Sequence, residues 1–386
     1  MIKREAEKTL KELARGFPAV AITGPRQSGK TTLAKFVFGG KPYVSLEDPD
    51  KREFAERDPR GFLAAYPNGA VLDEVQRVPS LFSYIQGIVD EKKQMGFFIL
   101  TGSEQFDLSS KISQSLAGRV GFLHLLPFSL KELQVAGFKF GTFDSLLFKG
   151  FYPPLYDRDL APSMWYANYV STYVERDVRR MLEIKDLSAF QRFIRMLAAR
   201  TGQLLNLSGL ANDCGITHNT AKAWLSVLEA SYIAFLLKPH HNNFGKRLTK
   251  APKIYFYDIG LASWLLGVTD PGQMSIHPMR GPLFESFVIS EIMKSAFNKG
   301  INPNLFFWRD NIGNEIDVLI EKANTITPLE IKSGQTITKD YFLYLKKWVQ
   351  LAGDTAGQPY VVYGGADREK REGVEILPWE GMDKLM

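Results

Sequence analysis

Short apolar runs alternate with amphipathic or polar stretches over the first 150 residues. The apolar runs have the length of buried strands and lie at residues 19–23, 43–46, 70–72, 97–100 and 122–126. The stretches between them are long enough for helices that cross from one strand to the next. Strands that alternate with helices indicate an α/β domain on a parallel sheet. The Gly-Phe-Tyr-Pro-Pro segment at 150–154 breaks the pattern, so we place the first domain boundary at 150.

The rest of the chain divides into a helical part and a mixed part. Residues 162–229 have a helical pattern, and strands mix with helices again from residue 254 to the end. A chain of 386 residues is long enough for two or three domains. We therefore expect three domains, at 1–150, 151–260 and 261–386.

A phosphate-binding motif follows the first predicted strand. Residues 24–31 form a complete G-x-x-x-x-G-K-T loop before a predicted helix at 31–38, which is the context the motif requires. In such a loop backbone amides surround phosphate oxygens, Lys30 adds positive charge at the β- and γ-phosphates, and the Thr31 hydroxyl is a ligand for magnesium. ATP and Mg²⁺ are therefore the expected cofactors. The expected nucleotide contacts are Gly24, Pro25, Arg26, Gln27, Ser28, Gly29, Lys30, Thr31 and Thr32.

Polar side chains with catalytic potential follow the next strands. Asp73 and Glu74 end an apolar strand, and we expect Asp73 to hold magnesium and Glu74 to orient and polarise the attacking water. Thr101 and Ser103 end another strand, and one of these hydroxyls is expected to touch the γ-phosphate or the water. Arg119 is a candidate for neutralising transition-state charge, in cis or on a neighbour's nucleotide. A surface salt bridge is an equally open interpretation of Arg119.

These residues together resemble the AAA+ ATPases, and more narrowly the prokaryotic ATP-binding proteins that join an AAA domain to a DUF4143 domain. The resemblance covers nearly the whole chain. It is specific in the phosphate loop, in Leu-Asp-Glu-Val-Gln at 72–76, and in Ser-Leu-Ala-Gly-Arg before Leu-Leu-Pro-Phe-Ser. It implies an α/β fold with an AAA+-like parallel sheet that hydrolyses ATP, a winged-helix middle segment and a restriction-endonuclease-like C-terminal domain.

The middle segment has the pattern of a helix-turn-helix. A short helix that starts at Leu207 reaches a glycine turn at 215, and Thr217 is a natural N-cap for a second helix at 218–229. Two helices joined by such a turn have the shape that enters a major groove. The face that reaches the bases would carry His218, Asn219 and Lys222.

A strand, a basic stretch and a second strand follow, which is the order of a wing. The basic stretch contains Lys246 and Arg247, side chains suited to phosphate contacts. Residues 151–250 hold 13 basic and 8 acidic residues, so this third of the chain is where a polyanion such as double-stranded DNA is expected. Winged helices also dock proteins and cover ATPase domains, and that alternative stays open.

Four residues of the C-terminal part form an acid-and-lysine pattern. Glu285 lies near the start of an amphipathic helix, Asp317 lies in a strand, and Glu330 and Lys332 share one face of the next strand. Asp317 and Glu330 would share a divalent metal, Lys332 would position or deprotonate a water, and Glu285 would complete the site. The pattern resembles the PD-(D/E)xK nucleases. The alternative is a salt-bridged, inactive nuclease fold kept for binding or assembly.

The composition excludes several classes of protein. The single cysteine, Cys214, excludes a disulfide framework and a Cys-based zinc site. The apolar stretches fall short of a membrane span and the charged start lacks a signal-peptide pattern, so we expect a soluble, cytoplasmic protein without membrane contact. Three functions remain open: an ATP-hydrolysing switch coupled to DNA, an ATP-regulated Mg²⁺-dependent DNA nuclease, and a non-catalytic ATP-gated protein-interaction module. Self-association is a further expectation.

Overall fold

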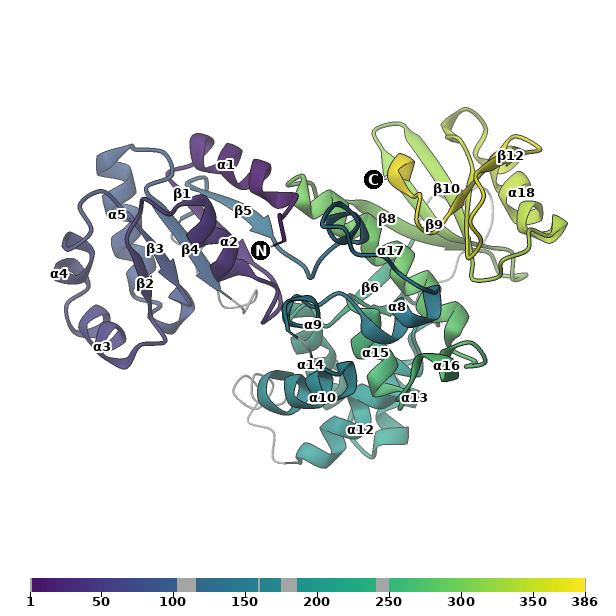
Figure 1. The fold of residues 1–386 in the computed structure, drawn as a ribbon, viewed down its shortest axis with the longest axis horizontal. Helices are drawn as coiled ribbons and strands as arrows, with labels where there is room; N and C mark the ends of the chain where they lie inside the picture. Colours follow the sequence, from purple (N-terminus) through teal and green to yellow (C-terminus); the bar gives the residue numbers. More distant parts are fainter. Residues whose placement is uncertain (1, 103–115, 159, 175–185, 241–249, 386) are drawn as a thin grey trace.

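The computed structural model describes residues 2–102, 116–158, 160–174, 186–240 and 250–385 (Figure 1). Two β-sheets lie at opposite ends of the view, the N-terminal sheet on the left and the C-terminal sheet at the upper right. Helices from the middle of the chain lie below and between them. No helix in these described ranges is both long and apolar enough to cross a bilayer.

The N-terminal sheet has five parallel strands in the order β2-β3-β4-β1-β5. This arrangement confirms the predicted parallel α/β sheet. Because β1 lies between β4 and β5, the carboxyl ends of β1, β3 and β4 meet at one edge, where α/β proteins bind ligands. The strands are β1 (Ala19–Thr23), β2 (Tyr43–Ser45), β3 (Ala70–Asp73), β4 (Phe98–Gly102) and β5 (Val120–His124).

Alternate residues of these strands face two separate cores, as the period of two requires. On β1, Val20 and Ile22 pack with the helices α1 (Ala6–Gly16) and α2 (Lys30–Val37). Ala19 and Ala21 face the opposite cluster. That second cluster takes side chains from α3 (Pro49–Arg57), α4 (Pro59–Ala64) and α5 (Leu81–Lys92). The sheet is thus covered on both faces, which explains its almost continuously buried strands.

The C-terminal sheet has eight strands in the order β12-β13-β11-β10-β9-β8-β6-β7. Its central pairs β8–β9 and β9–β10 are antiparallel, and β10–β11 is parallel. α18 (Leu343–Ala352) covers one face. The strands are β6 (Ala234–Pro239), β7 (Lys253–Phe256), β8 (Asn304–Arg309), β9 (Glu315–Lys322), β10 (Thr325–Lys332), β11 (Tyr360–Tyr363), β12 (Glu369–Arg371) and β13 (Val374–Pro378).

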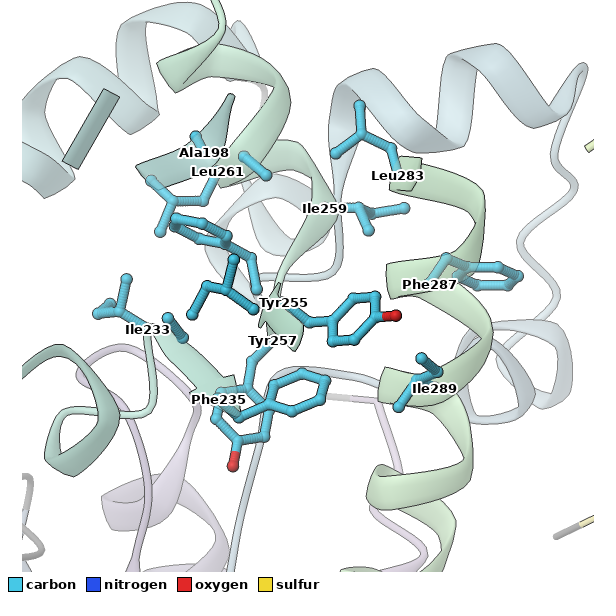
Figure 2. Close-up of a cluster of buried hydrophobic side chains, with 14 of the residues drawn as sticks. Ala198, Ile233, Phe235, Tyr255, Tyr257, Ile259, Leu261, Leu283, Phe287 and Ile289 are labelled. Atoms are coloured by element: carbon cyan, nitrogen blue, oxygen red, sulfur yellow. The ribbon is translucent and has the colours of Figure 1, made fainter. Parts of the chain in front are cut away.

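The remaining helices form one large core with the second sheet. Figure 2 shows part of it, where Phe235 and Tyr255 from the β6–β7 hairpin lie near Phe287 and Ile289. The helices are α7 (Leu130–Val135), α8 (Phe143–Lys149), α9 (Pro154–Asp157), α10 (Pro162–Tyr169), α12 (Leu187–Ala198), α13 (Leu207–Cys214), α14 (His218–Ala230), α15 (Ile259–Leu265), α16 (Pro271–Met274) and α17 (Arg280–Asn298). A short π-helical turn (Val170–Val174) continues α10. In the described part of the chain, 3₁₀ turns lie at Val75–Arg77, Lys339–Phe342, Gly353–Thr355 and Asp383–Leu385.

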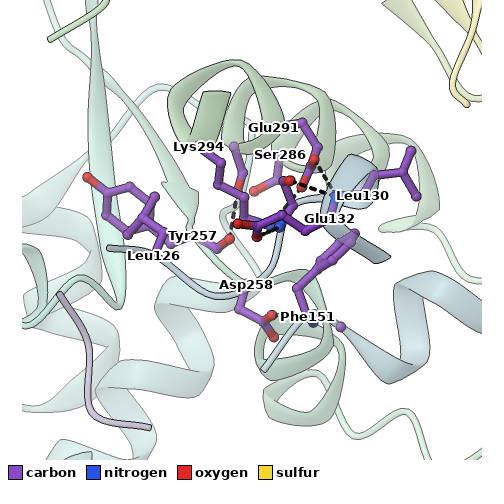
Figure 3. Close-up of polar contacts among 12 residues, drawn as sticks. Leu126, Leu130, Glu132, Phe151, Tyr257, Asp258, Ser286, Glu291 and Lys294 are labelled. Atoms are coloured by element: carbon purple, nitrogen blue, oxygen red, sulfur yellow. Dashed lines mark hydrogen bonds and ion pairs between the residues drawn. The ribbon is translucent and has the colours of Figure 1, made fainter. Parts of the chain in front are cut away.

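Packing crosses both of the boundaries expected from the sequence. α8 belongs to residues 1–150 by sequence, yet it packs against α15, α16 and α17. The β6–β7 hairpin likewise joins the C-terminal sheet, because β6 pairs with β8 in parallel through Lys238 and Phe306. Buried polar contacts tie the same regions together: Glu291 of α17 accepts a hydrogen bond from the Leu130 amide at 2.7 Å and pairs with Lys294 (Figure 3).

Candidate nucleotide-binding site and C-terminal acidic cluster

The phosphate loop connects β1 to α2 at the ligand edge of the first sheet. Gly24 has a φ of +149°, and a Cβ there would lie 2.1 Å from the Leu125 carbonyl oxygen, so only glycine fits. Gly29, with a φ of +92°, begins α2 and leaves the first amides of that helix open to an anion. The Lys30 ammonium is buried and donates to the carbonyls of Gly24 and Pro25 at 2.9 and 2.8 Å. The carbonyl oxygens of the loop therefore bind the ammonium of the loop's own lysine.

Asp73 is the polar centre of the site. Its carboxylate accepts hydrogen bonds from the Thr31 hydroxyl at 3.0 Å, from the Tyr43 hydroxyl at 2.6 Å and from Thr101. Burial and the neighbouring Asp73 charge raise the pKa of Tyr43, so this hydroxyl stays a donor at neutral pH. The predicted magnesium ligands, Thr31 and Asp73, are thus adjacent. Hydroxyl and carboxylate oxygens are the donors that Mg²⁺ prefers, so this pair fits the ion.

The predicted catalytic acid lies beside this centre. Glu74 follows β3 directly, with a φ of +54° in the left-handed region, and it accepts a hydrogen bond from the Gln76 side chain. The same cavity, of about 330 Å³, is lined by Glu74, Lys30 and Asp73. Thr101, one of the two hydroxyl candidates, contacts Asp73; the other, Ser103, lies outside the described residues.

Residues 153–158 of the middle segment cover the phosphate loop. Asp157 and Arg158 line the 330 Å³ cavity together with Arg26, Gln27 and Thr32 of the loop and helix. The Tyr169 hydroxyl also donates to the Arg26 carbonyl at 3.5 Å.

A second cavity of about 410 Å³ adjoins the first. The two share Gly29, Thr32, Pro153 and Asp157. Its other lining residues are the apolar Ile2, Leu33, Phe36 and Phe128 and the charged Lys3, Arg4 and Glu7. A polar compartment therefore opens beside one that is partly apolar at the start of α2.

Arg119 lies far from the phosphate loop. It precedes β5, and its carbonyl accepts from the Ala19 amide, at the edge of the sheet where β1 begins. The phosphate loop follows Thr23 at the opposite end of β1. The Arg119 guanidinium pairs with Asp90 of α5 at 2.5 Å. This geometry is inconsistent with action on the chain's own nucleotide and agrees with the salt-bridge interpretation; action on a neighbour's nucleotide stays a prediction.

The predicted helix pair is present as α13 and α14. The Asn206 side chain caps α13, Gly215 ends it with a φ of +68°, and the Thr217 hydroxyl caps α14 by accepting from the Thr220 amide at 3.1 Å. Trp224 is buried against Phe190 and Phe193 of α12, which fixes the orientation of α14.

The opposite face of α14 is open to solvent. His218, Asn219 and Lys222 are all exposed within its first turns. Lys246 and Arg247 lie outside the described residues. The β6 and β7 strands that flank them pair antiparallel, as a wing requires.

The C-terminal acids gather between α17, β7, β9 and β10. Glu285 Oε1 accepts hydrogen bonds from Lys253 Nζ at 3.1 Å and from the Tyr255 hydroxyl. Lys253 also pairs with Glu315, which in turn pairs with Arg309 at 3.2 Å. Burial alone would lower the pKa of Lys253, but the surrounding carboxylates raise it, so the ammonium stays charged.

Asp317, Glu330 and Lys332 complete this acidic cluster. Lys332 Nζ lies 2.5 Å from Glu330 Oε1 and 3.7 Å from Asp317 Oδ2. Burial, followed by the charge of Asp317, raises the pKa of Glu330 to about 8. Burial likewise raises the pKa of Glu285 to about 7, against the opposing charge of Lys253. The four residues predicted from the sequence therefore lie in one cluster. Lys332 pairs with Glu330 and Asp317, and Glu285 pairs with Lys253.

The acids of this cluster do not converge on a metal-sized position. Within the described ranges, no three His, Cys, Asp or Glu side chains are grouped so that they could hold a metal ion. One oxygen of the cluster lacks a hydrogen-bond partner among the described residues: Glu330 Oε2, which is buried. A bound ligand would satisfy it.

Three family profiles match successive parts of the chain. A profile described as AAA domain matches residues 16–134, and a domain of unknown function, DUF8612, matches residues 141–272. A second domain of unknown function, DUF4143, matches residues 280–382. Uncharacterized proteins Rv2008c of Mycobacterium tuberculosis and Mb2031c of Mycobacterium bovis are each 31% identical over 341 residues, which cover 86% of this chain and 74% of each relative.

The chain belongs to the AAA–DUF4143 family. This confirms the resemblance found in the sequence. Among solved structures, the AAA–DUF4143 chain is similar to the Walker-type ATPase PABY2304 of Pyrococcus abyssi, at 15% identity and a TM-score of 0.45, over 69% of this chain and 96% of that one. AMPPCP-bound DnaA from Aquifex aeolicus is similar at 17% identity and a TM-score of 0.30, over 58% and 85% of the two chains.

Several residues of the AAA–DUF4143 protein were missed by the sequence analysis. Lys253 and Tyr255 alternate on β7 and so face the acidic cluster together, a signal visible in their spacing of two. Tyr43 and Arg158 carry no such signal, because their proximity to the phosphate loop depends on how distant segments pack.

Proposed function

We propose that this AAA–DUF4143 protein binds and hydrolyses Mg-ATP at the phosphate loop. The observation that carries the proposal is the convergence of Lys30, Thr31 and Asp73 on one polar cavity at the carboxyl edge of a parallel sheet. Chance placement of a glycine-rich turn does not explain an acid from a different strand beside the loop threonine. The AAA-domain match over residues 16–134 supports the same conclusion.

Each residue has a distinct role in this proposal. Lys30 exchanges its loop carbonyls for phosphate oxygens, and the amides at the start of α2 bind the β-phosphate. Thr31 and Asp73 would hold magnesium, which supplies positive charge to the phosphates when bound. The Glu74 carboxylate, which lines the same cavity, orients the attacking water and accepts its proton.

The apolar cavity supports a nucleoside triphosphate rather than free phosphate as the ligand. It adjoins the phosphate-loop cavity at Gly29 and Thr32, so a nucleoside joined to phosphates in the loop could enter it. Phe36 and Phe128 offer the aromatic and apolar surface on which a base packs. We assign this cavity to the adenosine.

The hydrolysis cycle is proposed to act as a switch on DNA binding. α13 and α14 with the β6–β7 hairpin support a winged helix-turn-helix whose exposed residues His218, Asn219 and Lys222 contact duplex DNA. A hydrogen-bonded triad links it to the loop: Thr23 Oγ1 lies 2.8 Å from His124 Nδ1 and 2.9 Å from the Tyr232 hydroxyl. Thr23 immediately precedes the phosphate loop, and Tyr232 follows α14.

The test is phosphate release from Mg-ATP with and without duplex DNA, with Lys30→Ala as the control. We expect turnover that DNA increases and that Lys30→Ala abolishes. Unchanged turnover in the Lys30→Ala protein contradicts the ATPase assignment. Turnover that ignores DNA leaves the ATPase standing and favours an ATP-gated protein-interaction module.

A second candidate function concerns the C-terminal acidic cluster. The unpartnered Glu330 Oε2, buried beside Asp317, favours a site that takes a divalent cation, as in a Mg²⁺-dependent DNA nuclease. Glu330, Asp317 and Glu285 would be its ligands, and Lys332 would act on the water. Loss of DNA cleavage in Asp317→Ala with ATP turnover retained supports this function, and absence of metal-dependent cleavage by the natural protein contradicts it.

A further inference from the structure

Lys253 is the most deeply buried cation of the acidic cluster. Its side chain is 4% exposed, whereas those of Lys332 and Arg309 are 34% and 39% exposed. The ammonium pairs with Glu285 from α17 and with Glu315 from β9. It therefore bridges carboxylates from two elements, a position that a bound cation commonly takes.

The bonds of Lys253 use an oxygen that a metal would need. Glu285 Oε1 already accepts from both Lys253 and Tyr255. A divalent cation at this position would have to replace the ammonium, because two cations cannot share one desolvated carboxylate oxygen without strong repulsion. With this contact in place, no three acids among the described residues are grouped so that they could hold a metal ion.

We infer that Lys253 is a resident counter-ion that occupies the C-terminal acidic cluster in place of a divalent cation, so that metal binds only when this ammonium withdraws. The inference rests on the C-terminal site proposed above and adds its regulation. In the resting state Lys253 then contacts Glu285 and Glu315, and Lys332 contacts Asp317 and Glu330.

The backbone around Lys253 links this exchange to the helix-turn-helix segment. Lys253 pairs with Leu237 of β6 and bridges to Leu204, in the connection between α12 and α13. The Gly202 amide donates to the Ile254 carbonyl at 2.8 Å, and the Leu205 amide donates to the Pro252 carbonyl at the same distance. These bonds join β7 to the segment that leads into α13, so in this proposal a displacement of that segment would reach the ammonium.

The test is a titration of the EDTA-treated full chain with Mn²⁺, without nucleotide, followed by the free-Mn²⁺ signal in electron paramagnetic resonance. Lys253→Met is expected to bind Mn²⁺ about tenfold more tightly than the natural protein, or better, because a unit positive charge has left the site. Lys250→Met makes the same change of charge on the exposed approach to β7 and is expected to leave Mn²⁺ binding unchanged. Adding Asp317→Asn to Lys253→Met should remove the gain.

If Lys253→Met folds poorly, the melting temperature (Tm) of a second variant provides the test. Lys253→Gln retains a hydrogen-bond donor, and its Tm should lie below that of the natural protein without metal and recover in millimolar Mn²⁺. The Tm of the natural protein should not respond to the same Mn²⁺. Equal Mn²⁺ affinity in the natural protein and both Lys253 variants overturns the inference but leaves the metal site standing. Absence of Mn²⁺ binding in every protein overturns the metal site as well.

Discussion

The Arg4 guanidinium donates from Nη1 to the backbone carbonyl of Ser28, inside the phosphate loop, at 2.7 Å. The same group donates to the Leu126 carbonyl at 2.7 Å and pairs with Glu132 at 2.9 Å. Glu132 is completely buried, and it also accepts from the amides of Glu5 and Ser129. Arg4 thus fixes the phosphate loop against the segment that leads to α7. Holding the Ser28 carbonyl in this way is expected to keep the neighbouring loop amides available to a bound phosphate.

Replacing Arg4 should weaken nucleotide binding more than replacing its acidic partner. Arg4→Met removes the bond to the Ser28 carbonyl, and charge-assisted hydrogen bonds contribute about 1.5–3 kcal/mol, so we expect the Kd for ATP to rise by roughly tenfold or more. Glu132→Gln weakens the same ion pair but keeps the bond to Ser28, so its Kd should stay within about twofold. Both variants should lose stability. Nucleotide titrations check the difference, and equal losses of affinity would show that Arg4 acts only through stability.

Glu74→Gln should separate nucleotide binding from hydrolysis. The substitution keeps the size of the side chain and removes its ability to accept a proton. General-base catalysis contributes about 10²- to 10⁴-fold, so we expect turnover to fall by that factor while ATP still binds. Asp73→Asn is the matched comparison, and it should instead weaken the dependence of binding on Mg²⁺. Phosphate release and nucleotide titration measure the two effects, and a Glu74→Gln protein that turns over normally excludes this role.

The parts of these sites that are formed by neighbouring residues could be predicted, because each has a recognisable sequence pattern. The phosphate loop, the strand before Asp73 and the Thr217 cap of α14 follow from glycine placement, apolar runs and capping residues. Arg119 precedes a strand of the predicted parallel sheet, and such a residue must lie at the edge where the strands begin, opposite the phosphate loop, as the structure has it. Lys253, by contrast, could not be placed from the sequence. Its partners lie 32 and 62 residues away along the chain and meet it only in the folded second sheet.

The acidic cluster should make the protein less stable as the pH rises from about 5 to about 8. The pKa of Glu285 is about 7 and that of Glu330 about 8 in the folded chain, both above the ordinary 4.5. Between these values the folded state holds protons that the unfolded state has released, so the free energy of unfolding falls as pH rises. Each fully responsive group contributes up to about 1.4 kcal/mol per pH unit. Chemical denaturation across this range measures the slope.

Glu330→Gln provides the control for this pH dependence. The amide stays neutral at every pH, so the variant should show a shallower loss of stability between about pH 5 and pH 8 than the natural protein. Asp340→Asn changes an exposed acid whose pKa is instead lowered, by hydrogen bonds to Thr338 and to its own backbone. It should leave the slope over this pH range unchanged. Identical slopes in the natural and Glu330→Gln proteins would mean that Glu330 is ionised throughout.

Removing the Tyr232 hydroxyl should uncouple DNA binding from ATP turnover. In Tyr232→Phe, Thr23 and His124 remain bonded to each other at 2.8 Å, so the strand before the phosphate loop keeps its polar partners and the loss of stability is about 0.5–1.5 kcal/mol. Basal turnover should therefore be nearly unchanged, and the factor by which duplex DNA increases it should fall toward one.

Tyr257→Phe is the matched control for this coupling, because its ring packs 5.9 Å from that of Tyr232 in the same core. This variant should keep the stimulation by DNA, since Thr23 and His124 bond to Tyr232 and the substitution leaves those bonds in place. Phosphate release at saturating ATP, with and without duplex DNA, compares the three proteins. A Tyr232→Phe protein that responds fully to DNA would mean that the signal reaches the phosphate loop by another route. Residues 153–158 also line the cavity at the phosphate loop, and Arg158→Ala would then be the next substitution to measure.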